Sequence, residues 1–246
     1  MTSRYVHRAL QQTPQALDTS LPTVTDAFND AGYTTAYIGK WHLTGSNKLI
    51  HVPKEHRGRF DIWLGYENNN AQYDCWIHGH DQEGRDDTDP LAEKLEIYET
   101  DALTNRFIDF IKKQKDGDPF FGVLSVQPPH DPYVAPPEYE KNYTPESIQM
   151  RPNVPDIPRV KDPAREDLAG YYAQIENLDA NLGRILDTLE AEGMAENTHV
   201  IFFSDHGDSH GSHGHFRKSN PYEEAVRIPC IVLPAGGHRV QEQSNA

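Results

Sequence analysis

Cysteine is scarce in this 246-residue chain: Cys75 and Cys230 are the only two, and they stand far apart in the sequence. Two distant cysteines do not support a disulfide framework or a cysteine-based zinc site. No apolar run reaches the roughly 18 residues that a membrane-spanning helix needs. The sequence therefore excludes a small disulfide-stapled protein and contains no candidate membrane span.

Basic residues are also in the minority, with 23 Lys and Arg against 38 Asp and Glu and a formal net charge of -15. A nucleic-acid or anionic-membrane surface needs a basic footprint, so neither is an expected partner. The acidic excess is typical of a solvated surface. Individual basic side chains can still bind an anionic substrate.

The apolar residues that are present follow helical and extended patterns in turn. Helical spacing predicts helices over 21–32, 91–113 and 162–193, and short apolar runs predict strands over 33–38, 120–126, 199–204 and 228–233. Loops are expected over 44–90 and 128–163, which are rich in Asn, Asp and Pro. This alternation predicts an α/β fold with a mixed, mostly parallel sheet flanked by helices.

Polar side chains follow three of the predicted strands at the point where each strand ends. Lys40 and His42 follow the first, His130 follows the second, and Asp205 and His206 follow the third. Ligands of such folds bind outside the carboxyl ends of the strands. Three coincidences at one edge indicate a functional site there.

The most informative segment is SDHGDSHGSHGHFRK, which begins at the end of the strand predicted over 199–204. A carboxylate and an imidazole at the end of a buried strand lose several kcal/mol of solvation, which a bound metal or oxyanion would offset. Asp205 suits calcium, whereas His206 better suits zinc or manganese. His210, His213 and His215 could complete a zinc site with His206, or could be exposed histidines of a glycine-rich loop.

Each residue also has a simpler explanation. Lys40 and Lys218 could be surface lysines, His42 a hydrogen-bonding side chain, and His130 part of a rigid proline-flanked turn. The convergence of these residues on one strand edge favours the site.

The two cysteines and two further histidines carry less information. Cys75 is expected to be structural, and Cys230 to be an inert thiol in an apolar strand. His78 and His80 could line a substrate pocket, but a plain polar loop is the favoured interpretation.

Four long segments resemble one family: AGYTTAYIGKWHL (31–43), PFFGVLSVQPPHDPYVAPPEY (119–139), the helix over 171–193, and the metal-and-lysine segment over 197–232. In this order they resemble the type I, arylsulfatase-like sulfatases of the alkaline-phosphatase-like superfamily. The resemblance implies hydrolysis of a sulfate ester to an alcohol and sulfate. It also implies a formylglycine nucleophile, made from Cys or Ser, beside one calcium ion.

The resemblance assigns a role to each candidate residue. Asp205 and His206 would be calcium ligands. Lys40 and Lys218 would hold the sulfate oxygens, His42 would lie beside the nucleophile, and His130 would be the general acid for the leaving alkoxide. These six residues are the candidate site residues.

Some parts of the family's pattern are missing from the printed sequence. Its nucleophile motif, Cys or Ser followed by x-Pro-Ser-Arg, does not occur, and residues 1–8 resemble the segment just downstream of it. The strand with paired Asp ligands and the smaller C-terminal subdomain are also missing. Residues 1–246 are therefore predicted to be a partial sulfatase catalytic domain, an internal fragment that does not turn over by itself.

Substrate and activity remain open between three hypotheses. Glycan sulfate esters are the preferred substrates of a sulfatase. The alternatives are a phosphonate monoester hydrolase or phosphodiesterase of the same superfamily, and a non-catalytic remnant that binds metal or sulfated glycan. The family makes a periplasmic or extracellular location the expectation, while the sequence leaves the compartment and the oligomeric state open.

Overall fold

The computed structural model describes residues 16–44 and 50–237, and the segment over 1–8 lies outside them. The chain forms two compact units, Met1–Pro132 and Tyr133–Ala246, which we call the N-terminal and the C-terminal unit. No helix among the described residues is long and apolar enough to cross a membrane.

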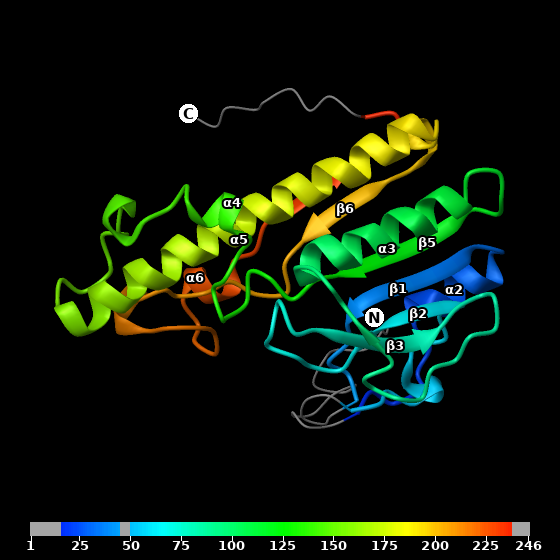
Figure 1. The fold of residues 1–246 in the computed structure, drawn as a ribbon, viewed down its shortest axis with the longest axis horizontal. Coiled ribbons are helices and arrows are strands. Elements are labelled where there is room, and N and C mark those ends of the chain that lie inside the picture. The colour runs from blue at the N-terminus through cyan, green and yellow to red at the C-terminus, as the bar shows by residue number, and fades with distance from the viewer. Residues whose placement is uncertain (1–15, 45–49, 238–246) are drawn as a thin grey trace. The chain divides into compact units, whose positions relative to one another are not determined.

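The N-terminal unit is built on a five-stranded sheet with the order β4-β3-β2-β1-β5 (Figure 1). β1 pairs in parallel with both β2 and β5, while β3 is antiparallel to β2 and to β4. The sheet is therefore mixed with a parallel centre, as predicted. The strands are β1 (Thr34–Lys40), β2 (Ile62–Tyr66), β3 (Trp76–His80), β4 (Glu93–Lys94) and β5 (Phe120–Ser125).

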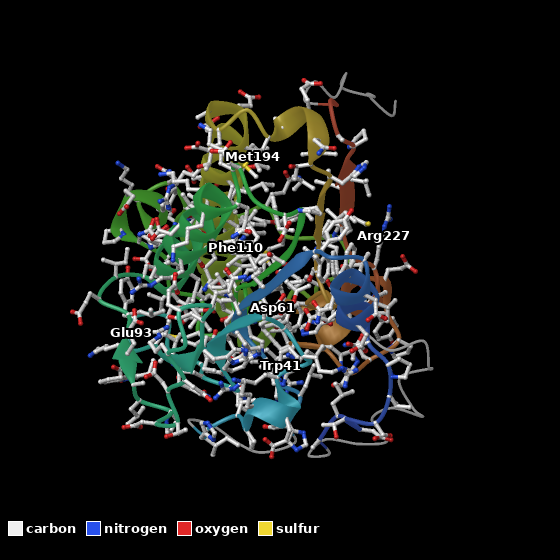
Figure 2. All side chains as sticks on the ribbon, turned by 90° about the vertical axis from the view of Figure 1, so that its right-hand side faces the viewer. Trp41, Asp61, Glu93, Phe110, Met194 and Arg227 are labelled. Atoms are coloured by element: carbon white, nitrogen blue, oxygen red, sulfur yellow. The ribbon has the colours of Figure 1, made fainter. Side chains whose placement is uncertain are left out.

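Helix α3 (Glu99–Lys113) packs on one face of β5 because a glycine leaves room for it. A Cβ at Gly122 would lie 2.9 Å from the ring of Phe107 and 3.2 Å from that of Phe110. Both rings are buried, and Phe110 lies among closely packed side chains (Figure 2). Side chains alternate along a strand, so the neighbouring Phe121 faces the other side of the sheet.

On that other side an aromatic cluster fills the space beside the sheet. Its buried members include Trp41 and Trp63, and Phe121 packs against them. Phe28 of helix α2 (Val24–Asp30) stacks on Phe121 with ring centroids 4.1 Å apart. The sheet is therefore covered on both faces, which leaves its strand ends for a site.

The C-terminal unit contains the long helix α5 (Pro158–Ala191) and a separate two-stranded antiparallel sheet (Figure 1). One stripe of α5 is buried and carries Leu168, Ile185 and Leu189, with the helical spacing expected from the sequence. The remaining elements are β6 (Val200–Phe203), β7 (Cys230–Leu233) and the short helices α4 (Pro137–Glu140) and α6 (Glu223–Val226).

Several predicted elements need correction. Most described residues of the segment over 44–90 are loop, as expected, but the segment also contains β2, β3 and a 3-10 turn before β2, which the sequence did not predict. Its strand WIHGH carries polar residues at buried positions, which hid the extended pattern. The helix predicted over 91–113 begins at Glu99, and the one predicted over 162–193 begins at Pro158. Cys230 is exposed rather than part of a core.

Candidate functional site

The end of β1 turns sharply at His42, and a buried carboxylate holds the turn. His42 has a left-handed backbone with a φ of 54°, and its N–H donates to the carbonyl of Glu67 at 2.8 Å. The buried carboxylate of Glu67 accepts from the N–H groups of Leu43 (3.2 Å) and Thr44 (2.9 Å). The chain is thus not extended through His42, so its two-residue spacing from Lys40 does not by itself align the two side chains.

A second buried carboxylate, Glu99, lies at the same edge of the sheet. It accepts hydrogen bonds from the hydroxyl of Tyr66 and from the N–H of Gln127, the latter at 3.0 Å. Burial raises the pKa of Glu99 to about 7, and the nearby positive charge of Lys40 acts in the opposite direction. Glu99 therefore joins the end of β2 to the loop after β5 and places a carboxyl group near Lys40.

His130 lies in the loop that follows β5. Its Nδ1 donates to the carbonyl of Asp131 at 2.8 Å and lies 3.1 Å from the Asp131 carboxylate. The amide of Gln72 donates to the carbonyl of His130 at 3.2 Å, which fixes the loop from the side of β3. Because β1 and β5 are parallel neighbours, the segments with Lys40, His42 and His130 leave one edge of one sheet.

In the C-terminal unit, Asp205 and His206 follow β6 as a pair. The N–H of His206 donates to Oδ1 of Asp205 at 3.0 Å, and its Nδ1 donates to the carbonyl of Gly207 at 2.8 Å. Because Nδ1 carries the proton in that second bond, Nε2 of His206 keeps a lone pair that can bind a metal. Nε2 lies 3.6 Å from Oδ2 of Asp205. The pair therefore presents one nitrogen and one carboxylate close together, as two ligands of one cation would require.

Two ligands do not make a complete metal site. The described part of the chain holds no group of three or more His, Cys, Asp or Glu side chains that could bind a metal ion. Calcium takes six to eight oxygen ligands. Asp205 and His206 therefore supply too few ligands to hold a calcium ion by themselves.

The described residues do not support the histidine zinc site that the sequence left open as an alternative. His210 is buried, and its ring centroid lies 4.4 Å from that of Tyr171. His213 stacks on Tyr222 at 4.1 Å, and His215 lies beside the same tyrosine ring. These histidines pack against aromatic rings instead of converging on one point.

Asp208 organises the loop between His206 and Lys218, and the sequence interpretation missed it. Its carboxylate accepts from the hydroxyl of Tyr133 (2.7 Å), the N–H of Arg217 (2.9 Å) and the N–H of His210 (3.2 Å). The Arg217 guanidinium in turn donates to the Tyr133 hydroxyl at 2.7 Å and lies over the Tyr133 ring. Because Lys218 follows Arg217 directly, this network sets where Lys218 leaves the loop.

His78 and His80 belong to the core of the N-terminal unit, so neither the pocket nor the polar loop suggested by the sequence is correct. His78 Nε2 accepts from the N–H of Val52 at 2.9 Å. The buried guanidinium of Arg57 donates to Nδ1 of His80 at 2.9 Å, while Nε2 of His80 donates to the carbonyl of Phe60. Burial, with Arg57 nearby, lowers the pKa of His78 to about 4.

The raised pKa of Glu99 predicts a pH effect on stability. The unfolded chain loses this proton near its ordinary pKa of 4.5, whereas the folded chain keeps it up to about pH 7. The free energy of unfolding therefore falls as the pH rises from 4.5 to 7, by about 1.4 kcal/mol for each unit of pKa difference. The glutamine of Glu99→Gln stays neutral, so this variant should not show that decrease in the free energy of unfolding. Urea unfolding at a series of pH values measures the free energy of unfolding of both chains.

The exposed Glu96 provides the control. Glu96→Gln is expected to keep the pH dependence of the unmodified chain. If the unfolding free energies of Glu99→Gln and the unmodified chain run parallel between pH 4.5 and 7, Glu99 does not keep its proton in the folded state.

Substitution of the two aspartates of the loop is predicted to lower stability by very different amounts. Asp208→Ala leaves the Tyr133 hydroxyl and two backbone N–H groups without their acceptor, which costs about 3 kcal/mol. The side chain of Asp205 is 85% exposed, so Asp205→Ala costs about 0.5 kcal/mol or less. Urea unfolding followed by circular dichroism compares the two variants. Equal losses would contradict a structural role for Asp208.

Known proteins are similar to this chain over most of its length. The family model described as Sulfatase matches residues 1–246. The chain is 35% identical over 217 residues to an ulvan-active sulfatase of Formosa agariphila. The matched region covers 87% of this chain and 41% of that protein. It is 27% identical over 207 residues to the multifunctional alkaline phosphatase superfamily protein PehA of Trinickia caryophylli, covering 71% of this chain and 40% of that protein.

A solved structure agrees with the fold. The putative sulfatase yidJ from Bacteroides fragilis matches with a TM-score of 0.77 and 29% identity, over 88% of this chain and 50% of that one. The chain thus spans about half the length of the proteins it matches. With a family model that matches its whole length, and with the segments that carry Lys40, His130, Asp205 and Lys218 in place, the chain belongs to the sulfatase family.

Proposed function

We propose that the whole protein is a sulfuric ester hydrolase that acts on glycan sulfate esters. The observation that carries the proposal is the Asp208 network, because it holds Asp205, His206 and Lys218 on one ordered loop. The similarity to an ulvan-active sulfatase supports a glycan substrate. The reaction breaks the bond between sulfur and the ester oxygen, and water supplies the elements that form the alcohol and sulfate.

Two lysines provide positive charge for the sulfate group. Lys40 ends β1 and Lys218 ends the loop after β6. Ammonium groups bind anionic oxygens through charge-assisted hydrogen bonds and stabilise negative charge that develops during the reaction. We assign both lysines to the sulfate oxygens of a single bound ester.

Two histidines provide for proton transfer. His42 is exposed on its left-handed turn, where its imidazole is assigned to the hydroxyl groups of the nucleophile. The His130 ring is oriented through Nδ1 by Asp131. A histidine oriented in this way suits a general acid that gives a proton to the leaving alkoxide oxygen.

Asp205 and His206 would hold the calcium ion together with ligands outside the described residues. When bound, that ion supplies positive charge beside the reacting sulfate group. The sulfatase nucleophile motif is missing from the 246 residues, so we propose that this chain alone does not release sulfate.

The competing activity is hydrolysis of phosphonate monoesters or phosphodiesters. The similarity to PehA favours keeping it as an alternative. Tetrahedral phosphorus and sulfur esters need similar stabilisation of their oxygens, so the same lysines would serve both. A comparison of the binding of sulfated and phosphorylated ligands distinguishes the two activities.

Lysine variants test whether the proposed site recognises a sulfate ester. The 246-residue chain is expected to bind a sulfated oligosaccharide more tightly than its desulfated form or its phosphorylated counterpart. Lys218→Ala should weaken binding of the sulfated ligand about tenfold, because one charge-assisted hydrogen bond is lost. Calorimetric titration measures the dissociation constants.

Two further variants complete this experiment. Lys112→Ala removes an exposed lysine from the end of α3 and should leave the affinity unchanged. Lys40→Ala should also weaken binding, and its melting temperature is compared because the Glu99 carboxyl lies near that charge. Equal binding of sulfated and desulfated ligands contradicts the proposal, whereas tighter binding of the phosphorylated ligand supports the competing activity.

A further inference from the structure

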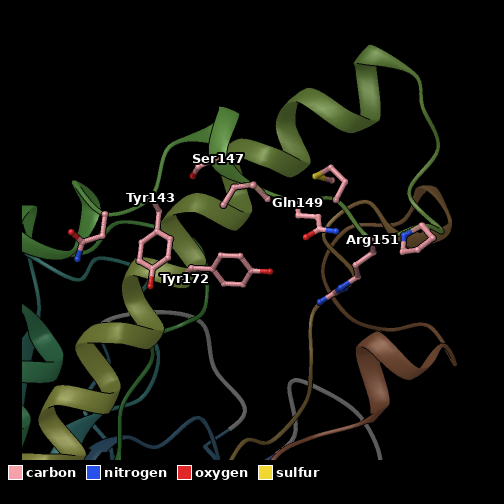
Figure 3. Close-up of a pocket in the computed structure, with 9 residues that line it drawn as sticks. Tyr143, Ser147, Gln149, Arg151 and Tyr172 are labelled. Carbon is pink, nitrogen blue, oxygen red and sulfur yellow. The ribbon is translucent and has the colours of Figure 1, made fainter. Parts of the chain in front are cut away.

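The C-terminal unit has a pocket of about 590 Å³ that the proposed catalytic residues do not use. It lies between α5 and the segment over 142–152, as Figure 3 shows. Tyr143 and Tyr172 line it together with the polar side chains of Gln149 and Arg151. The pocket thus combines aromatic rings with hydrogen-bonding groups.

The aromatic rings rest on a buried base. Tyr143 and Tyr172 have ring centroids 5.9 Å apart and planes tilted by 57°. Both pack against a core cluster that includes Ile148 and Leu168. Rings fixed in this way offer a preformed apolar surface, which suits the C–H face of a sugar ring.

The polar side of the pocket carries a guanidinium group. Arg151 uses Nη1 to donate to the carbonyl of Ser209 at 3.4 Å and to the hydroxyl of Ser212 at 3.3 Å. Among the described residues its other guanidinium nitrogens make no hydrogen bond. A guanidinium with donors to spare is suited to a carboxylate or sulfate group, whose oxygens match its planar geometry.

The two ends of the pocket differ in charge. At the Tyr143 end, the amide of Asn142 donates to the carboxylate of Glu176 at 2.9 Å. Figure 3 shows Arg151 at the opposite end and the Tyr172 ring pointing toward it. A ligand with one negative group is therefore expected to place that group at Arg151 and its ring over the tyrosines.

Arg151 also joins the pocket to the proposed site. Ser209 and Ser212 lie within the loop that begins with Asp205 and His206 and ends before Lys218. We propose that the pocket is a glycan subsite that binds an acidic sugar ring, carboxylated or sulfated, adjacent to the sugar whose ester is hydrolysed. This inference rests on the proposed action on glycans.

Direct binding to the 246-residue chain tests the subsite. Three disaccharides are compared by NMR titration: one with a uronic acid and no sulfate, the same compound with its carboxyl group reduced to an alcohol, and a neutral-sugar disaccharide with one sulfate. We expect the uronic acid disaccharide to bind about tenfold more tightly than its reduced form, because one charge-assisted contact is lost on reduction.

Variants locate that binding. Arg151→Gln should abolish the preference for the acidic disaccharide, whereas Arg159→Gln, which removes an exposed arginine from the first turn of α5, should not. Because Arg151 also contacts the loop, Gln149→Ala is a second variant and should weaken binding of all ligands that enter the pocket. Its control is Gln82→Ala, an exposed glutamine of the N-terminal unit.

The outcomes separate the subsite from the proposed activity. The unsulfated disaccharide has no ester to be hydrolysed, and its binding should be unchanged in Lys218→Ala. Tighter binding of either acidic disaccharide than of the reduced form supports the subsite when the preference is lost in Arg151→Gln and kept in Lys218→Ala, and the ligand that shows it identifies the acidic group. Equal binding of acidic and reduced disaccharides, or a preference that survives Arg151→Gln, overturns the subsite and leaves the lysine experiment unaffected.

Discussion

Carboxylates that accept backbone N–H groups, buried at Glu67 and Glu99 and half-buried at Asp208, are the constraint on which the rest of the site depends. Glu67 holds the turn after β1, Glu99 holds the start of the loop after β5, and Asp208 holds the loop after β6. Removing a carboxylate from water is costly unless hydrogen bonds replace the lost solvation. Each loop therefore has to keep the conformation that supplies those bonds, and each carries a candidate catalytic residue.

Glu99 and Asp208 meet this constraint in different ways. Glu99 has two hydrogen-bond donors and a pKa of about 7, so it can gain a proton when its surroundings change. Burial opposes ionisation of Asp208, but the His210 ring, its hydrogen-bond donors and the Arg217 charge lower its pKa below the usual value. The carboxyl group in the loop with Lys218 is therefore easier to ionise than an ordinary aspartic acid, whereas the Glu99 carboxyl near Lys40 is harder to ionise than an ordinary glutamic acid.

The sequence predicted the elements with strong periodicity and missed those without it. The long helix and the apolar strand FFGVLS were predicted within a few residues, because burial on one or both faces dictates their patterns. The strand WIHGH was missed because its buried positions hold His78 and His80, which are satisfied by Arg57 and by backbone groups contributed from distant segments. Such pairings are set by the fold and leave no local pattern.

The sequence likewise predicted some residues of the candidate site and missed others. Strand-end position and motif resemblance predicted a site with Lys40, His130, Asp205 and Lys218, and these roles stay predictions. Neither feature identified Glu67 or Asp208, because a supporting carboxylate is recognisable only from the N–H groups around it. The sequence could not decide between a zinc site and loop histidines for a related reason, since aromatic contacts such as that of His210 with Tyr171 depend on α5.

Native-state hydrogen exchange of individual amides tests the role of the three carboxylates most directly. The N–H groups of Thr44, Gln127 and Arg217 each donate to one of these side chains. Their exchange should be at least about a hundredfold slower than in an unstructured chain, because each is freed only when its loop opens. The N–H of His206, which donates to the exposed Asp205, should exchange much faster. Exchange of Thr44, Gln127 and Arg217 at the rate of His206 would contradict the account.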